Sequence, residues 1–478
     1  MLFSSILFLW IFLPIVIIVN GILSVVHFKD EPTRYKWKNM FLLLASLIFY
    51  AWGGIYYLLL MLAVILINFW GGYFIGKFKE KKKGILVGTI ILNLSLLFYF
   101  KYFNLFISVI ENITKNEKGA FGFKEVILPI GISFYIFQAM SYVIDVYREK
   151  TKVQGNIFYF ALYVSLFPQL IAGPIVQYSD VESQIFTRAE NYEKFAAGIK
   201  RFCYGLGKKV IISNTLATVV DQIFICEVSS FGADIAWLGM ISYTLQIYYD
   251  FSGYSDMAIG LGKMLGFEFK ENFNYPYTSL SVSEFWRRWH ISLSSWFRDY
   301  VYIPLGGSRG KLARTCFNLF VVFFLTGVWH GANFTFFAWG MYYAVILIIE
   351  RVFLSKLLKK NPIKAINWIY TILLVMIGWV MFNSATLEYA IGFIGNLFVF
   401  EQRAVTMFNF LNMKYIIVLF LAILFSGFLQ RMFTNVYEKY KHNCAVVIGD
   451  YVIQFTLLIY SIILIISGTY NPFIYFQF

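Results

Sequence analysis

Long apolar blocks separated by short polar loops dominate the pattern of hydrophobic and polar positions along this chain. A helix needs about 20 apolar residues to cross the hydrocarbon layer of a bilayer, and most of the blocks are close to that length. The pattern therefore predicts an all-α fold, a polytopic transmembrane helical bundle with about 11 crossings plus re-entrant or interfacial helices. The apolar blocks lie at residues 3–26, 39–53, 55–76, 84–110, 126–147, 157–177, 200–225, 235–265, 315–330, 334–353, 365–384, 414–430 and 446–470.

The composition also excludes an ordinary water-soluble domain. Of the 478 residues, 59% are hydrophobic and 14% are charged, and the mean hydropathy is +0.68. The aromatic content of 21% suits the interfaces where rings meet lipid headgroups. The formal net charge is +14, but the basic residues lie in short loops and not on one continuous face. Membrane lipids are therefore expected around the protein, and no nucleic-acid partner is expected.

The basic loops predict how the chain is oriented. Lys and Arg concentrate in residues 29–38, 77–83 and 148–152, with two apolar blocks between successive clusters. Short loops rich in Lys and Arg stay on the cytosolic side, so the N-terminus is expected outside. The first block has neither a charged leading region nor a small-residue cleavage site, which indicates the retained first helix of a multi-pass protein.

Two stretches interrupt the apolar pattern. Pro168 and Pro174 remove backbone donors within the segment 166–174. Broken backbone at membrane depth must be covered by protein or line a cavity. Residues 267–315 are polar and aromatic, and they form the longest interruption. A long insertion of this kind is typically functional.

His330 is a candidate for chemistry because it ends an apolar block. About 14 residues of helix cover only about 20 Å, so His330 is expected inside the membrane. An ionisable ring at that depth is a functional candidate by default. The alternative is a neutral imidazole that forms a hydrogen bond between helices. His27 and His442 lie beside basic loops and are expected to be ordinary interfacial residues.

His290 lies in the polar stretch. Ser281 followed by Glu284 is typical of a capping box that opens a helix. Such a helix either lies at the membrane interface or lines a reaction chamber near His330. Helical spacing would place on one face Trp286, His290, Leu293 and Phe297, and on another Arg288, Ser292, Ser295 and Asp299.

Asp250 and Asp256 lie within an otherwise apolar block, so partners for their charges are expected. The candidate partners are Arg287, Arg288 and Arg298. A structural ion pair and a direct part in catalysis both remain open. The four cysteines lack ligand spacing, and two histidines about 40 residues apart make an unconvincing ligand set, so no metal is expected.

The motifs of the chain resemble those of the membrane-bound O-acyltransferase family. The strongest are EFWRRWHISLSSWFRDYVYIPLGG at 284–307 and GVWHGA at 327–332. Three more resemble the branch that contains alginate O-acetyltransferase and peptidoglycan O-acetylation proteins: LPIGISFYIFQ at 128–138, LFPQLIAGP at 166–174 and DFSGYSDMAIG at 250–260.

This resemblance implies a single membrane domain over residues 1–478, with a motif-bearing core at 120–340 between flanking transmembrane helices 1–119 and 341–478. It implies a helical bundle around a tunnel in a bacterial cell membrane, with His330 and His290 as the catalytic histidines. His330 is expected to act as a general base on an acceptor hydroxyl that attacks a thioester, while His290 positions the donor or orients His330. Positioning of substrate or donor is expected from Trp286, Arg287, Arg288, Ser292, Arg298, Asp256, Trp329 and Asn333.

The implied activity is O-acetyl transfer. Acetyl-coenzyme A would be the cytosolic donor, with no tightly bound cofactor. Its phosphates, or an acidic carrier, would meet the basic residues Arg287, Arg288, Arg298 and Arg309, which do not decide between the two. The acetyl group would pass towards hydroxyls of an extracytoplasmic polysaccharide or to a partner acetyltransferase.

Two other functions stay open. The same family includes D-alanyl transfer from a carrier protein to teichoic acid, and recovery of a phosphopantetheinyl carrier protein with this chain would favour it. A proton-coupled transporter could use His330 and Asp256 as a relay, and ion flux that survived His330→Ala without any acyl transfer would point to it. The sequence lacks the paired broken helices of many transporters, which counts against transport.

Overall fold

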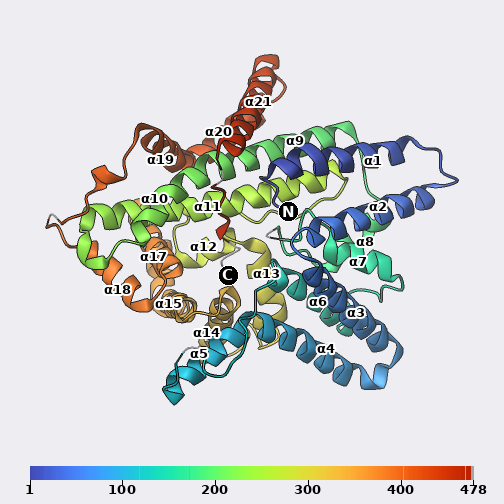
Figure 1. The fold of residues 1–478 in the computed structure, drawn as a ribbon, viewed down its shortest axis with the longest axis horizontal. Helices are drawn as coiled ribbons and strands as arrows, with labels where there is room; N and C mark the ends of the chain where they lie inside the picture. Colours follow the sequence, from blue (N-terminus) through green and yellow to red (C-terminus); the bar gives the residue numbers. More distant parts are fainter. Residues whose placement is uncertain (118, 172, 402, 469, 475–478) are drawn as a thin grey trace. The chain divides into compact units, whose positions relative to one another are not determined.

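The computed structural model describes residues 1–117, 119–171, 173–401, 403–468 and 470–474. These residues form helices and no strand, apart from an isolated β-bridge between Phe231 and Val405, so the all-α prediction is confirmed (Figure 1). The α-helices are α1 (Leu13–Val25), α2 (Glu31–Ala51), α3 (Ile55–Lys77), α4 (Lys82–Leu97), α5 (Phe103–Thr114), α6 (Ile132–Tyr147), α7 (Ile157–Ser165), α8 (Tyr178–Phe186), α9 (Tyr192–Gly207), α10 (Asn214–Phe224), α11 (Ala233–Met264), α12 (Val282–Arg288), α13 (Ile291–Phe297), α14 (Leu312–His330), α15 (Phe334–Ile349), α16 (Ser355–Lys360), α17 (Lys364–Asn383), α18 (Leu387–Asn396), α19 (Met413–Phe425), α20 (Phe428–Tyr440) and α21 (Cys444–Ser467). Short 3-10 or π-type segments adjoin or connect them at η1 (Phe8–Phe12), η2 (Lys79–Lys81), η3 (Phe98–Tyr102), η4 (Lys208–Ser213), η5 (Val228–Ser230), η6 (Pro276–Thr278), η7 (Arg298–Tyr302), η8 (Glu350–Leu354) and η9 (Met407–Asn409).

Seven helical segments of the described chain are long and apolar enough to cross a membrane, or up to eight if the bent pair α19 and α20 forms one span. The expected count of about 11 crossings is therefore not confirmed. Several apolar blocks form shorter helices: α6 and α9 each have 16 residues, fewer than the about 20 that a straight crossing needs. The seven segments are Phe8–Val25, Ile55–Lys77, Lys79–Thr114, Leu312–His330, Phe334–Lys360, Lys364–Asn383 and Cys444–Ser467.

The chain divides into two compact units that interleave in sequence. The first comprises Met1–Ile199 and Ala258–Lys270, and the second comprises Lys200–Met257 and Glu271–Phe478. The expectation of a single domain stays a prediction. Both histidines of interest, and every other predicted site residue, belong to the second unit.

In the first unit, α3 packs against α4 and α6, and α2 packs against α1 and α7. The non-helical stretch after α7 contains Pro168 and Pro174, and its described residues are buried up to Val176. The ring of Phe167, for example, lies 5.2 Å from that of Phe12. The expectation that protein covers this broken backbone is confirmed, although Ala172 lies outside the described residues.

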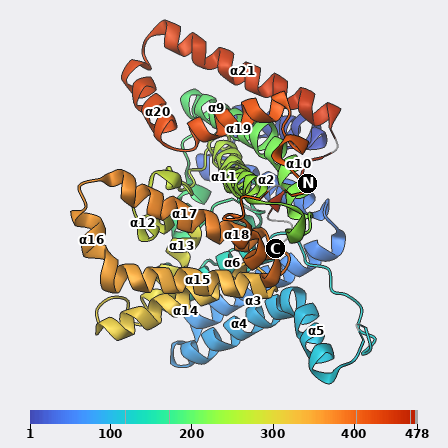
Figure 2. The ribbon, with the colours of Figure 1, turned by 90° about the vertical axis from the view of Figure 1, so that its left-hand side faces the viewer.

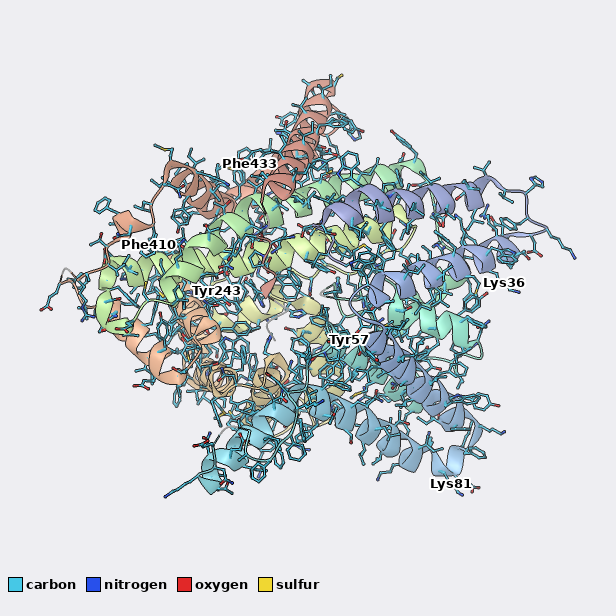
Figure 3. The ribbon with its side chains drawn as sticks, viewed as in Figure 1. Lys36, Tyr57, Lys81, Tyr243, Phe410 and Phe433 are labelled. Atoms are coloured by element: carbon cyan, nitrogen blue, oxygen red, sulfur yellow. The ribbon has the colours of Figure 1, made fainter. Side chains whose placement is uncertain are left out.

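Two of the basic loops in this unit lie together. The Nζ atom of Lys82 is 3.0 Å from Oε1 of Glu149, which joins the loops at 77–83 and 148–152. Figure 3 shows Lys36 and Lys81 at the outer ends of α2 and of the α3–α4 hairpin. Between successive basic loops, one described segment in each interval is long and apolar enough to cross a membrane, Ile55–Lys77 and then Lys79–Thr114, so the prediction of two crossings per interval is not confirmed. The side of the membrane on which the loops lie stays a prediction.

In the second unit, α14 packs along α15, and α15 packs against α17 (Figure 2). The short helix α12 contacts α13, α15 and α17. This group joins the polar stretch at 267–315 to the apolar helix that ends at His330. The second unit therefore assembles the candidate site from segments that are separate in the sequence.

Candidate active site around two histidines

His330 is buried among aromatic rings from three helices. Its imidazole centroid lies 5.0 Å from each of three ring centroids, those of Trp329, Trp339 and Phe382. These residues belong to α14, α15 and α17. The last turn of an apolar helix thus carries an ionisable side chain into aromatic surroundings, and the position of His330 inside the membrane stays a prediction.

Two glycines allow the helices around His330 to approach closely. A Cβ atom on Gly327 of α14 would lie 2.4 Å from the carbonyl oxygen of Phe336. On Gly340 of α15, it would lie 2.5 Å from the carbonyl oxygen of Phe323. Real Cβ contacts are not this short, so any larger residue would force α14 and α15 apart. The position of His330 therefore depends on the absence of side chains at this crossing.

His290 lies at a break between two short helices. Ser281 caps α12, because its Oγ accepts a hydrogen bond of 3.0 Å from the backbone N–H of Glu284. The carboxylate of Glu284 accepts from the N–H of Leu280 at 3.0 Å. The helix ends at Arg288, and His290 has a left-handed backbone with φ of 45° before α13 begins. The prediction of one continuous helix with two faces is wrong, because the tertiary contacts of His290 stabilise a break that helical periodicity does not reveal.

Asn272, buried before α12, holds that break together. Its Oδ1 accepts hydrogen bonds from the backbone N–H of Ser292 at 3.1 Å and from Ser292 Oγ at 2.9 Å. The same oxygen lies 3.2 Å from Nδ1 of His290. Its backbone carbonyl accepts from the N–H of Ile291 at 2.9 Å. A single asparagine thus binds the first residues of α13 and the imidazole that precedes them.

The two histidines are linked through Trp329. The ring of Trp329 lies 6.2 Å from that of His290 and 5.0 Å from that of His330. On another side, Phe251 of α11 lies 4.5 Å from His290. Burial lowers the pKa of His290 to about 3, because a charged imidazole loses its hydration there. His290 is therefore neutral at physiological pH.

Trp286 extends the aromatic wall. Its ring lies 5.5 Å from Trp339 and 4.9 Å from Tyr343. The indole N–H groups of Trp286 and Trp339 are buried without a hydrogen-bond partner among the described residues. Buried donors of this kind are suited to a polar ligand atom, since an unsatisfied N–H is costly.

The predicted positioning arginines are not equivalent. Arg288 donates to Oε1 of Glu284 and to the carbonyl oxygen of Asn274, so neighbouring residues hold it. Arg298 pairs with Asp299 at 2.8 Å, and its side chain is 61% exposed. Arg287 is exposed and makes no ion pair with the described part of the chain. Of the three, Arg287 is therefore the one whose charge is available for an anionic ligand.

The carboxylates of α11 have other partners than those predicted. Asp256 accepts from Nε of Arg201 at 2.8 Å and from Nζ of Lys208 at 2.7 Å. Asp250 pairs with Lys209. The assignment of Arg287, Arg288 and Arg298 to these carboxylates is wrong. Basic residues inside the apolar block at 200–225 supply the partners, because α9 and η4 pack beside α11.

The chain near residue 470 adds further contacts to Asp250. Its Oδ2 accepts a 2.9 Å hydrogen bond from the backbone N–H of Ile474, and the carbonyl oxygen of Pro472 accepts from Lys209. Phe473 packs against Tyr254 of α11, with ring centroids 4.9 Å apart. These contacts favour a structural ion pair at Asp250, which the sequence had left open against a catalytic part.

Asn333 caps α15. Its Oδ1 accepts from the N–H of Thr335 at 3.2 Å, and its Nδ2 donates to the carbonyl oxygen of Ala385 at 3.0 Å. Its predicted role in donor positioning stays a prediction. Asn272 was not among the predicted residues. It lies 18 residues before His290, and this separation matches no helical or motif spacing, so the contact between the two residues arises only in the folded chain.

Comparisons with known proteins agree with the motifs. The model of the membrane-bound O-acyltransferase family matches residues 85–391. The chain is 40% identical over 502 aligned positions to a probable alginate O-acetylase AlgI of Pseudomonas putida, and the alignment covers 100% of both chains. It is 34% identical over 423 positions to a peptidoglycan O-acetyltransferase of Helicobacter pylori, covering 82% of this chain and 78% of the relative.

A third relative is more distant. The chain is 29% identical over 236 positions to a teichoic acid D-alanyltransferase of Bacillus subtilis, covering 47% of this chain and 59% of the relative. The similarity to O-acetyl-transferring proteins is thus both higher and more extensive.

Proposed function

This chain belongs to the membrane-bound O-acyltransferase family and is an O-acetyltransferase, and from that premise we propose that it carries acetyl groups from cytosolic acetyl-coenzyme A towards hydroxyls on the outer side of a bacterial membrane. The observation that carries the proposal is the burial of His330, at the end of an apolar helix, within the rings of Trp329, Trp339 and Phe382.

His330 acts in this proposal as the general base. Its imidazole takes the proton from an acceptor hydroxyl, and the oxygen attacks the carbonyl carbon of the acetyl thioester. The carbon–sulfur bond breaks, and the coenzyme A thiolate takes the proton back from the imidazolium. Ester and free thiol are the products, so atoms and charges balance. General base catalysis of this kind contributes about 10²- to 10⁴-fold in rate.

The two substrates approach from opposite faces. Short loops rich in Lys and Arg favour the cytosolic side, which places the N-terminus outside. The exposed guanidinium groups of Arg287 and Arg309 are suited to the phosphates of acetyl-coenzyme A. The acceptor is a polysaccharide hydroxyl or an extracytoplasmic partner acetyltransferase. Similarity to a probable alginate O-acetylase and to a peptidoglycan O-acetyltransferase supports this class of acceptor.

Transfer of radiolabelled acetyl by the purified chain in liposomes tests the proposal. Acetyl-coenzyme A is supplied on one side and candidate polysaccharide acceptors on the other. We expect label transfer by the intact chain and by His442→Ala, because His442 is exposed and remote in sequence from the site. Transfer should be lost in His330→Ala and reduced in His290→Ala, with folding retained in both.

Two outcomes would overturn the proposal. Full transfer by a folded His330→Ala variant would show that His330 is not the general base. The second outcome is that the intact chain transfers no acetyl group, but a phosphopantetheinyl carrier protein is recovered with it and D-alanyl transfer from that carrier is detected. The carrier protein would then be the donor in place of acetyl-coenzyme A.

A further inference from the structure

The hydrogen bonds at Asn272 fix which end of its amide faces His290. The backbone N–H of Ser292 can only donate, and it lies 3.1 Å from the atom of Asn272 that it contacts. That atom must accept, so it is the carbonyl oxygen Oδ1. Ser292 Oγ donates its single proton to the same oxygen at 2.9 Å. The orientation of the Asn272 amide therefore follows from the backbone N–H of Ser292, which can act only as a donor.

The orientation of Asn272 in turn determines the tautomer of His290. Oδ1 of Asn272 lies 3.2 Å from Nδ1 of His290, and a carbonyl oxygen only accepts. The hydroxyl of Ser292 lies 3.4 Å from the same nitrogen, but its proton is already directed at Asn272. Nδ1 must then carry the proton and donate it. In the neutral ring, the lone pair is left on Nε2.

The surroundings hold His290 in this position. Its left-handed backbone, with φ of 45°, is unfavourable for a residue with a side chain and persists only where tertiary contacts determine it. Asn272, which is 0% exposed, supplies those contacts through both its side chain and its carbonyl group. The rings of Phe251 and Trp329 limit rotation of the imidazole.

We propose that Asn272 is a positioning residue of the transfer reaction, which fixes His290 as the Nδ1–H tautomer so that Nε2 accepts a hydrogen bond from an N–H or O–H group of a substrate. This inference rests on the proposed function, because the tautomer matters only if His290 takes part in transfer. Two substrates offer such a group: the acceptor through its hydroxyl, and the pantetheine arm of acetyl-coenzyme A through its amides. His290 itself takes no proton in this role.

Nitrogen NMR of the full chain, with ¹⁵N-labelled histidine, tests the tautomer directly. The chain has only four histidines, and the signals that disappear in His290→Gln identify those of His290. We expect a protonated Nδ1 and an unprotonated Nε2 in the intact protein, and a mixture of tautomers in Asn272→Ala. A protonated Nε2 in the intact protein would overturn the proposal, and this measurement needs no folded variant of Asn272.

Kinetics test the positioning role. We expect Asn272→Ala to lower kcat by about 10- to 100-fold, since small misplacement of a functional group costs up to about 100-fold. Asn274→Ala is the matched control, because it removes an exposed asparagine two residues away. A rise of KM for acetyl-coenzyme A would assign the hydrogen bond to the pantetheine arm, and a rise of KM for the polysaccharide would assign it to the acceptor. Unchanged kcat and KM in folded Asn272→Ala would overturn the role.

The conservative variant Asn272→Asp should restore activity that Asn272→Ala loses, and it should also change the pH dependence of the rate. The carboxylate keeps an acceptor beside Nδ1, so most of kcat should return at alkaline pH. Because a negative charge favours the imidazolium, His290 would become protonated at a higher pH than before and lose its lone pair. The acidic limb of the rate profile should therefore move to higher pH.

If the intact chain transfers no acetyl group, the proposed function fails while the NMR result still stands. If it transfers normally and both Asn272 variants match it in rate and pH profile, only this inference fails.

Discussion

The described residues around the two histidines of the site differ in kind. Around His330 are the rings of Trp329, Trp339 and Phe382, contributed by three long apolar helices. Around Nδ1 of His290 are the amide of Asn272 and the hydroxyl of Ser292, at a break between two short helices. Aromatic rings pack around the first imidazole, and directional hydrogen bonds hold Nδ1 of the second.

This difference separates the roles of the two rings. Hydrogen bonds that fix a tautomer also fix which nitrogen can accept, and burial keeps the pKa of His290 near 3. An imidazole whose pKa lies far below physiological pH is a weak base, so it is better suited to orient a substrate than to carry a proton. In the proposed mechanism, His330 is then the residue that takes and returns the proton. The comparison predicts that the two positions respond differently to the same substitution.

The largest expected effect comes from glutamine at each position. His330→Gln should lower kcat by about 10²- to 10⁴-fold, because an amide cannot act as a base. His290→Gln should cost much less, about tenfold, since the amide oxygen still accepts a hydrogen bond. Acetyl transfer by the two folded variants measures the difference. Equal losses would show that the two surroundings do not separate the roles.

The packing around His330 can be tested without touching a histidine. Gly327→Ala should lower the free energy of unfolding by about 1–3 kcal/mol and also lower kcat, because its Cβ would push α14 away from α15. Gly88→Ala in α4 is the matched control, since no atom lies within 4 Å of a Cβ there. Thermal unfolding in detergent together with acetyl transfer checks both effects. Normal stability and activity in Gly327→Ala would contradict the close crossing.

The polar surroundings of His290 should appear in the pH dependence of stability. Its pKa falls from 6.5 to about 3 on folding, so the unfolded state binds more protons between these values. The contribution of His290 is then fully present above pH 6.5 and is lost progressively as the pH falls below it. Unfolding temperatures across this range should fall less steeply in His290→Gln than in the intact chain. The same slope in both proteins would mean that His290 is not buried as a neutral ring.

The smallest expected effect is at Arg298. Its ion pair with Asp299 is largely exposed to solvent, and exposed pairs contribute about 0–1 kcal/mol to stability. Arg298→Ala should therefore leave unfolding within about 1 kcal/mol of the intact chain, and transfer should be nearly unchanged. A large loss of transfer with an increased KM for acetyl-coenzyme A would instead show that Arg298 helps to bind the donor.

The sequence pointed to His330 as a candidate because a polar ring at the end of an apolar helix is a strong local signal, and Trp329 came with the motif of the family. It found the Ser281 cap for the same reason, since the N-terminus of a helix is encoded within a few residues. It failed at His290, where periodicity predicted one helix with two faces after Ser281 and the chain forms two helices, α12 and α13. It also failed for the partners of Asp250 and Asp256, because ion pairs across helices have no fixed spacing along the chain.

The sequence by itself determined the all-α membrane fold and the family, and it pointed to the two histidines as candidates, because lengths of apolar segments and dense motifs are local properties. The tertiary structure alone decided that Asn272 holds His290, that Trp329 lies against both imidazoles, and that Lys208, Lys209 and Arg201 meet the carboxylates of α11. The physical reason is that hydrogen bonds and ring contacts depend on distances in space, and chain positions far apart reach those distances only when the helices pack.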